Sequence, residues 1–294
     1  MIQLSIDSSV ARSKPAERNR VEWIRSGEWL DSQDITLPML PARATEIMHL
    51  AMDPEVSASR IATVVSKDQV LATLVLRLAN SAFSAPASDI TNVSDAVVRV
   101  GTRAVRNVVV ASCLASRLKD PQIYGKYGPD LTDHSIGTAY LARLVAEQSG
   151  DSPDEAFLYG LLHDIGKLLI LKLGRDSSLR YGPPASDEEI EALMVEKHAE
   201  FGGYLLEQWK LPAHLNDPVV WHHRPYRAES DPRAAAVAYA ANRLAHRYGF
   251  GCSSDGFDPL SDQVCASVGL DAARLEEMDT RAPGLFAVAR QIIR

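Results

Sequence analysis

Apolar residues recur at steps of three and four along most of this chain, which is the spacing of helices with one buried face. The sequence shows no stretch in which apolar and polar residues alternate as they do in a half-buried strand. The pattern therefore predicts an all-α protein. The predicted helices lie at 37–53, 58–66, 70–80, 93–100, 105–118, 131–149, 153–173, 187–208, 211–223 and 232–248, with shorter ones near 259–268, 270–277 and 282–293.

Turn-forming residues predict how these helices are grouped. The segment 120–130 contains two prolines and two glycines, which favour turns over helix. We therefore expect this segment to separate two helical subdomains. The predicted division is a lead-in with a short helix at 1–36, a first helical subdomain at 37–118, a second helical core at 131–250 and a helical extension at 251–294.

Single residues predict some helix ends. Ser57 precedes an apolar-periodic segment, so its hydroxyl is expected to accept a hydrogen bond from a free amide of the first turn. Gly101 follows the segment 93–100 and is expected to end that helix. In the lead-in, Trp23 and Trp29 are the main apolar anchors, and we expect them to pack on the rest of the protein.

Composition and charge narrow the class of protein. Hydrophobic residues make up 46% of the 294 residues, which is enough for a buried core. The 31 basic and 38 acidic residues give a net charge of −7, which argues against nucleic acid as a partner. Three scattered cysteines form no disulfide framework. No apolar run reaches the length of a membrane span, so we expect a cytoplasmic protein without a membrane partner.

Histidines and acids gather in the second half of the chain. An adjacent His-Asp pair can direct an imidazole and a carboxylate to one cation, a ligand set that suits iron, manganese, zinc or nickel. Such a pair also occurs in buried polar cores, where hydrogen bonds satisfy both side chains. In that alternative, Asp133 and Glu200 are the expected partners of the histidines. The candidate metal ligands are His134, His163, Asp164, His198, His222 and His223.

The segment Leu161–Lys167 resembles the signature of the HD phosphohydrolase superfamily. His198–Gly202 and the Trp221-His222-His223 run resemble the continuation in its HD-GYP branch, which cleaves cyclic dinucleotides. The resemblance implies two metal ions bridged by Asp164. It assigns His134 and His163 to the first ion, with a final aspartate, and His198, His222 and His223 to the second. Lys167 would then neutralise a phosphate oxygen; in the other interpretation it is a solvated lysine.

Two departures from that pattern concern catalysis. Asn242 stands where the final aspartate is expected, so the first metal site loses a negative charge while keeping an amide oxygen as a ligand. The Gly-Tyr-Pro element of the cyclic-di-GMP enzymes is missing after His223. Dedicated cleavage of cyclic di-GMP is therefore not expected of this chain.

The first half of the chain resembles a narrower family. Leu37–Pro41, Leu76–Phe83 and Val100–Arg106 are similar to recurring elements of the HDOD domain, the HD-related output domain of bacterial signalling proteins. Together the two halves cover residues 37–250. The resemblance implies an all-helical fold of two subdomains and a regulatory or interaction module that lacks one or more metal ligands.

Two hypotheses of function follow from the residues and from the resemblance. The first is a regulatory module that binds a signalling protein partner or a ligand through a degenerate metal site, with little or no turnover. The second is a metal-dependent phosphohydrolase or phosphodiesterase acting on a nucleotide or other phosphoester, with Lys167 and Asp164 in catalysis. One or two divalent transition metals are the implied cofactor.

The remaining basic residues and histidines give weaker predictions. Arg99, Arg103 and Arg106 could form a basic patch for an acidic ligand, or simply a solvated helical face. The three histidines outside the candidate ligand set are interpreted as surface or packing residues. They are His49, His214 and His246.

Overall fold

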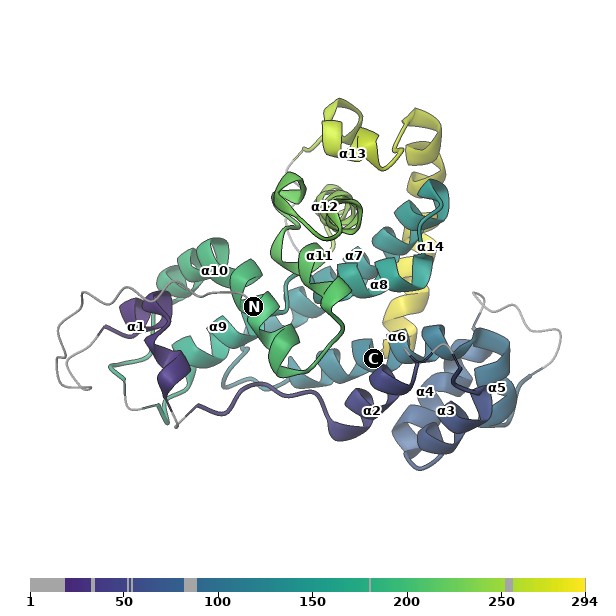
Figure 1. The fold of residues 1–294 in the computed structure, drawn as a ribbon, viewed down its shortest axis with the longest axis horizontal. Coiled ribbons are helices and arrows are strands. Elements are labelled where there is room, and N and C mark those ends of the chain that lie inside the picture. Colours follow the sequence, from purple (N-terminus) through teal and green to yellow (C-terminus); the bar gives the residue numbers. More distant parts are fainter. Residues whose placement is uncertain are drawn as a thin grey trace.

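The computed structural model describes residues 19–32, 35–51, 53, 55–81, 89–179, 181–251 and 256–293. Within these ranges all regular elements are helices, which confirms the predicted all-α class (Figure 1). The residues before 19, residues 82–88 and Cys252 lie outside the described ranges. No helix in the described part of the chain is long and apolar enough to cross a membrane.

The first group of helices follows a short lead-in. Its members are α2 (Ala42–Leu50), α3 (Ala58–Val65), α4 (Gln69–Ala79), α5 (Val93–Val100) and α6 (Thr102–Arg117). Ser57 caps α3 as predicted, because its hydroxyl accepts a hydrogen bond from the amide of Arg60 at 3.3 Å. Gly101 ends α5 as predicted, with a φ of 84° that disfavours other residues.

The second group of helices carries the candidate metal ligands. Its members are α7 (Tyr127–Ser149), α8 (Pro153–Leu162), α9 (Gly166–Arg175), α10 (Asp187–Gln208), η3 (Ala213–Leu215), α11 (Asn216–Val220), η4 (Pro225–Arg227) and α12 (Pro232–Arg247). A single hydrophobic cluster runs from Val21 to Val219 through helices of both groups. The two groups therefore share a buried core.

Two predicted helices of the second group are interrupted. The expected helix 153–173 breaks at His163–Ile165, between α8 and α9. The expected helix 211–223 is reduced to η3 and α11, so His222 and His223 lie in the turn that follows α11. Hydrophobic periodicity missed both breaks because the residues that flank them remain apolar. The predicted helix 131–149 is longer than expected, because α7 already starts at Tyr127. Pro129 is tolerated in its first turn, where the backbone N–H has no intrahelical partner to lose.

The C-terminal extension forms a small second core. It consists of η5 (Pro259–Ser261), α13 (Gln263–Ser267) and α14 (Ala272–Ile293). The predicted helices 270–277 and 282–293 are one helix, α14, with Pro283 inside it. Residues of α7, α8 and α12 pack with residues of α13 and α14 in a separate hydrophobic cluster. Figure 1 shows α14 running along the second group toward α6.

The lead-in packs on the second group, as predicted. Its described part contains α1 (Arg20–Ser26) and η2 (Glu28–Asp31). Trp23 stacks on Tyr181 with ring centroids 4.2 Å apart, and Trp29 contacts Phe201 with ring centroids 5.1 Å apart. The buried guanidinium of Arg20 donates to backbone carbonyls of the loop between α9 and α10. The acceptors are the carbonyl oxygens of Gly174, Asp176, Leu179, Tyr181 and Gly182.

Arg20→Ala should lower the free energy of unfolding by about 3 kcal/mol, because it leaves several buried carbonyls without a donor. Urea denaturation of the purified variant measures the change. Arg25→Ala is the matched control on the same helix. Its ion pair with Glu196 joins side chains that are each 44% exposed, so the loss there should stay below about 1 kcal/mol. Equal losses in the two variants would contradict this role of Arg20.

Candidate metal centre

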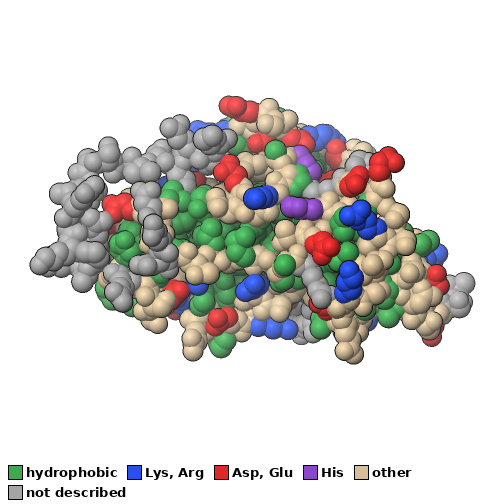
Figure 2. Space-filling model, turned by 60° about the horizontal axis from the view of Figure 1, so that its bottom comes forward, with side chains coloured by type: hydrophobic (Ala, Val, Ile, Leu, Met, Phe, Trp, Pro, Cys, Tyr) green, Lys and Arg blue, Asp and Glu red, His purple; other side chains and the backbone are tan. Residues whose placement is uncertain are grey.

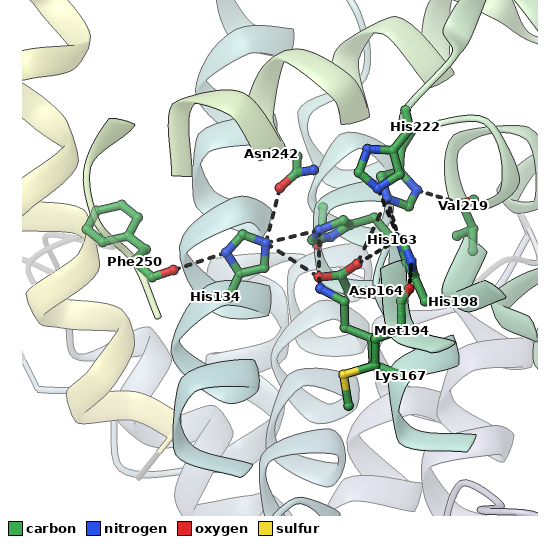
Figure 3. A network of polar contacts seen from close by, with 12 residues as sticks. His134, His163, Asp164, Lys167, Met194, His198, Val219, His222, Asn242 and Phe250 are labelled. Atoms are coloured by element: carbon green, nitrogen blue, oxygen red, sulfur yellow. Dashed lines mark hydrogen bonds and ion pairs between the residues drawn. The ribbon is translucent and has the colours of Figure 1, made fainter. Parts of the chain in front are cut away.

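The fold brings the seven predicted metal ligands together around one carboxylate, that of Asp164. Lys167 pairs with the same carboxylate, and Figure 3 labels all of these residues except His223. They come from five different parts of the second group. His134 lies in α7, Asn242 in α12 and His198 in α10, while the other ligands lie in the turns after α8 and α11. His163 and His222 are fully buried, whereas His223 is exposed. The centre is therefore open to solvent on the His223 side.

Two glycines allow the ligand-bearing segments to approach one another. A Cβ on Gly166 would lie 1.9 Å from the carbonyl oxygen of His198, and one on Gly202 would lie 2.7 Å from Val219. A side chain at position 166 would therefore push α10 away from the His163–Asp164 turn. This close approach is the local reason why the apolar run through 153–173 bends where it does.

Backbone carbonyls hold the imidazole rings of four histidines. The Nδ1 atom of His134 lies 3.0 Å from the carbonyl oxygen of Phe250, and that of His163 lies 2.7 Å from Gly160. His222 Nδ1 lies 2.7 Å from the carbonyl oxygen of Val219, and His198 Nδ1 contacts Met194 in the same way. A carbonyl can only accept, so each Nδ1 carries the proton and each Nε2 presents a lone pair to the centre. A backbone carbonyl that accepts from the ring nitrogen facing away from the centre is typical of metal-binding histidines.

The first group of ligand atoms surrounds one oxygen of Asp164. Asp164 Oδ2 lies 3.5 Å from His134 Nε2 and 3.3 Å from His163 Nε2. The two Nε2 atoms are 3.2 Å apart. Asn242 Oδ1 lies 3.1 Å from His134 Nε2.

The second group of ligand atoms surrounds the other oxygen of the same carboxylate. Asp164 Oδ1 lies 3.3 Å from His198 Nε2 and 3.9 Å from His222 Nε2. His198 Nε2 is 3.2 Å from His222 Nε2 and 3.0 Å from His223 Nε2. Asp164 thus faces one group with each oxygen, which is the arrangement of a bridging carboxylate.

Apart from the 3.9 Å between Asp164 Oδ1 and His222 Nε2, these separations fit the edges of a metal coordination polyhedron. With metal–nitrogen bonds of about 2.1 Å, neighbouring ligand atoms lie about 3.0 Å apart in an octahedron and about 3.4 Å apart in a tetrahedron. Facing Nε2 atoms that both carry lone pairs cannot hydrogen-bond to each other. A cation placed between them binds both lone pairs and makes such an arrangement favourable. The residues therefore fit a divalent transition metal.

Burial keeps the imidazoles neutral, the form that binds metal. It lowers the pKa of His134 to about 3 and the pKa values of His198 and His223 to about 4, and it holds the pKa of His222 well below the ordinary value. Burial opposes ionisation of Asp164, but the His163 ring and the Lys167 ammonium hold its pKa well below the ordinary value. A proton is therefore a poor substitute for a metal here.

Lys167 pairs with the carboxylate rather than pointing away from the centre. Its Nζ donates to Asp164 Oδ2 at 2.5 Å, the oxygen that faces the first group. The lysine side chain is 23% exposed. The alternative in which Lys167 is merely solvated does not describe this geometry, because the ammonium belongs to the charge balance of the centre.

Two predictions about neighbouring residues are corrected. Glu200 does not satisfy the histidines, since it accepts from Lys197 at 3.1 Å and the rings are held by backbone carbonyls. Arg106 is not part of an exposed basic face, because it is 1% exposed and pairs with Glu155 at 3.0 Å. Arg99 and Arg103 are exposed. His246 is a packing residue as predicted, with its ring 5.2 Å from that of His134.

Four residues that orient the histidine rings were not predicted from the sequence: Phe250, Met194, Val219 and Gly160. Each contributes only a backbone carbonyl, so the identity of the side chain carries no signal. A carbonyl aimed at a histidine becomes visible only once the helix ends are placed. The backbone carbonyls that orient the histidine rings are therefore placed by the fold, and residue types alone could not predict them.

Comparisons with known proteins agree with this fold. A protein of Treponema pallidum (strain Nichols) described only as uncharacterized is 29% identical over 217 residues, which cover 69% of this chain and 41% of that protein. Ribonuclease Y of Pseudothermotoga lettingae is 34% identical over 124 residues, 41% of this chain and 20% of that protein. This chain thus matches less than half the length of either relative.

A solved structure and a family model extend the comparison. The crystal structure of an HDOD domain protein of unknown function from Geobacter sulfurreducens aligns with a TM-score of 0.71 and 22% identity, covering 93% of this chain and 98% of that one. The model of the HDOD domain family matches residues 37–225. The match contains every candidate ligand except Asn242, which follows it. The chain belongs to the HDOD domain family.

Proposed function

We propose that this chain is a regulatory signalling module that holds one divalent transition metal ion and binds a protein partner or an anionic ligand, with little or no turnover. The observation that carries the proposal is the charge of the centre. Among the described residues Asp164 is its only acidic ligand, and Lys167 already pairs with that carboxylate at 2.5 Å. The other ligands are neutral imidazoles and the amide of Asn242.

This charge balance favours one metal ion over two. Two dications would leave twice the uncompensated positive charge of one dication in a largely buried site, and buried net charge is costly. In a neutral site, one dication leaves an excess of positive charge that an anionic group can offset. A carboxylate or phosphate of a partner therefore suits the open side of the centre.

The three-histidine group is the favoured position for that ion. His198, His222 and His223 offer three neutral nitrogens, and Asp164 Oδ1 completes a four-ligand set. In the first group of ligand atoms, Lys167 already donates a hydrogen bond to Asp164 Oδ2. Asn242 can also satisfy His134 without a metal, because an amide turned over donates its N–H to Nε2. An aspartate in that position could not donate.

A single ion also limits hydrolysis. Phosphoester-cleaving dinuclear sites use paired metals to stabilise both the attacking and the leaving oxygen. One ion can polarise a phosphoryl oxygen and supply hydroxide, but it lacks that clamp. The face in Figure 2 interleaves acidic and basic side chains over the described residues and shows no continuous basic area. This face therefore offers a nucleic acid no extended basic surface.

A metal-dependent phosphodiesterase is the second candidate. It is favoured by the similarity to ribonuclease Y over 124 residues, and by Lys167 and His223 on the accessible side of the centre. In this function the Lys167 ammonium would leave Asp164 for a non-bridging phosphate oxygen. The residues would bind and orient a phosphoester, and the metal would supply the nucleophile.

Metal analysis together with a hydrolysis assay tests the proposal. Protein purified without a histidine tag or chelator should contain about one transition metal ion per chain, and Asp164→Asn should contain almost none. The wild type should hydrolyse bis(p-nitrophenyl) phosphate no faster than Asp164→Asn. A metal-dependent rate on the order of 1 per second that disappears in the folded variant would establish the second candidate instead.

A further inference from the structure

The ring of His134 depends on a segment outside the matched family domain. Its Nδ1 is held by the carbonyl oxygen of Phe250, three residues beyond the end of α12. The other buried histidines are held by carbonyls three or four residues before them in their own helical turns. His134 alone among these four takes its partner from a distant part of the chain.

The segment around Phe250 lies flush against α7. A Cβ on Gly137 would lie 2.5 Å from the Phe250 ring, so the glycine provides the space for that ring. Gly251 has a φ of 65°, and a Cβ on it would lie 2.0 Å from the carbonyl oxygen of Asp130. The segment thus approaches α7 at Asp130 and at Gly137, on either side of His134. A small shift of the segment therefore moves the carbonyl that orients the ring.

The ring of Phe250 is in turn covered by α14. Phe286 stacks on it with ring centroids 3.9 Å apart and an interplanar angle of 13°. The buried face of α14 continues upstream through Ala282, Met278 and Leu275 at helical spacing. Figure 1 shows the end of α14 beside α6, and α14 also contacts α4. One helix thus connects the first helical group with a ligand of the centre.

Pro283 gives α14 a weak point next to this contact. A proline inside a helix removes one backbone hydrogen bond and favours a kink. Gly284 follows it, and a Cβ there would meet nothing within 4 Å. The part of α14 that carries Phe286 is therefore less firmly tied to the rest of the helix than an unbroken helix would be.

We propose that Phe286 is a positioning residue for His134, acting through the stacked ring and the backbone carbonyl of Phe250. Displacement of the end of α14 then releases Nδ1 of His134 and loosens the first ligand group, which is the weaker position for a metal ion. A partner that moves α14 would change the centre without touching it. The metal part of this inference rests on the proposed function; the orientation of His134 does not.

The test compares Phe286→Ala with Met278→Ala, which removes a fully buried side chain from the same helix face about two turns upstream of the stacked ring. In metal-free protein, the imidazole signals in long-range ¹H–¹⁵N correlation spectra report which ring nitrogen carries the proton. Phe286→Ala should convert the fixed Nδ1–H pattern of His134 to an average of both forms and leave those of His163 and His222 unchanged. Met278→Ala should leave all three unchanged. Phe286→Leu, which keeps an apolar contact, should retain part of the wild-type pattern and provides the measurement if the alanine variant does not fold.

Zinc titration gives a second measurement. Binding of a second Zn²⁺ equivalent should weaken roughly tenfold or more in Phe286→Ala, while the first equivalent is unchanged. An unchanged His134 signal in Phe286→Ala, or equal changes in Phe286→Ala and Met278→Ala, would overturn the inference. Failure of the wild type to bind a first equivalent would instead overturn the proposed function, and the His134 signal would still decide this inference.

Discussion

The metal-free protein should lose several kcal/mol of its free energy of unfolding as the pH falls from about 6.5 to about 4. His134 has its pKa lowered from 6.5 to about 3 by burial, and His198 has it lowered from 6.5 to about 4 for the same reason. At roughly 1.4 kcal/mol per pKa unit, the shift of His198 alone corresponds to about 3 kcal/mol. Because the rings lie close together, their contributions do not simply add.

The free energy of unfolding falls as the pH falls because the unfolded chain binds more protons than the folded protein. Between these pH values the unfolded chain takes up protons on histidines that the folded protein keeps neutral, so acid favours unfolding. The stabilisation is fully present above about pH 6.5 and is lost as the pH falls through the folded pKa values. The carboxyl groups of Asp164 and Glu155, whose pKa values are also lowered, add losses only below their ordinary values of 3.8 and 4.5. The histidine window therefore lies above the carboxyl window.

Urea denaturation of chelator-treated protein across this pH range measures the effect. His198→Gln should flatten the curve between pH 6.5 and 4, because it removes one buried group that takes up a proton on unfolding. His49→Gln is the matched control, since His49 is exposed on α2, and it should follow the wild type. A stability that stays constant down to pH 4.5 in the wild type would contradict a buried neutral histidine cluster.

The parts of the fold that could be predicted are those that follow from apolar spacing and helix caps. The long helices α10 and α12 lie close to the expected ranges because their apolar residues recur at helical spacing and polar or turn-forming residues mark their ends. The break at His163–Ile165 was not predictable from spacing, since its cause is the contact of Gly166 with the carbonyl of His198, 32 residues away in sequence. Long-range close approach leaves no periodic signal.

The candidate site, like the fold, has parts that could be predicted from the sequence and parts that could not. The ligand types and their order predicted which histidines and which acid would meet, and the resemblance to a known family supplied the grouping. The pairing of Lys167 with one oxygen of Asp164 could not be predicted, because it depends on the relative rotation of two short segments. The burial of Arg106 was missed for a related reason. Glu155, its partner, is 49 residues away and sits at the start of α8.

Asn242→Asp should create a strong second metal position. The substitution places a carboxylate oxygen beside the first ligand group, where Asn242 Oδ1 now lies 3.1 Å from His134 Nε2. An aspartate supplies a negative charge to an ion that otherwise shares Asp164 with the first. The affinity for a second Zn²⁺ or Mn²⁺ equivalent should rise by roughly 100-fold. Isothermal titration of chelator-treated protein measures both equivalents.

Asn19→Asp is the matched control, because Asn19 caps α1, where its side-chain oxygen accepts from the amide of Val21 at 2.8 Å, and aspartate caps helices as well as asparagine does. It adds the same charge to the protein and should leave both metal affinities unchanged. If the second candidate function is correct, Asn242→Asp should also raise the rate of phosphodiester hydrolysis, since a paired site stabilises both reacting oxygens. A second equivalent that binds equally weakly in Asn242→Asp and in the wild type would mean that position 242 is not a ligand position. The preference of the centre for one metal ion would then rest on the charges of Asp164 and Lys167 alone.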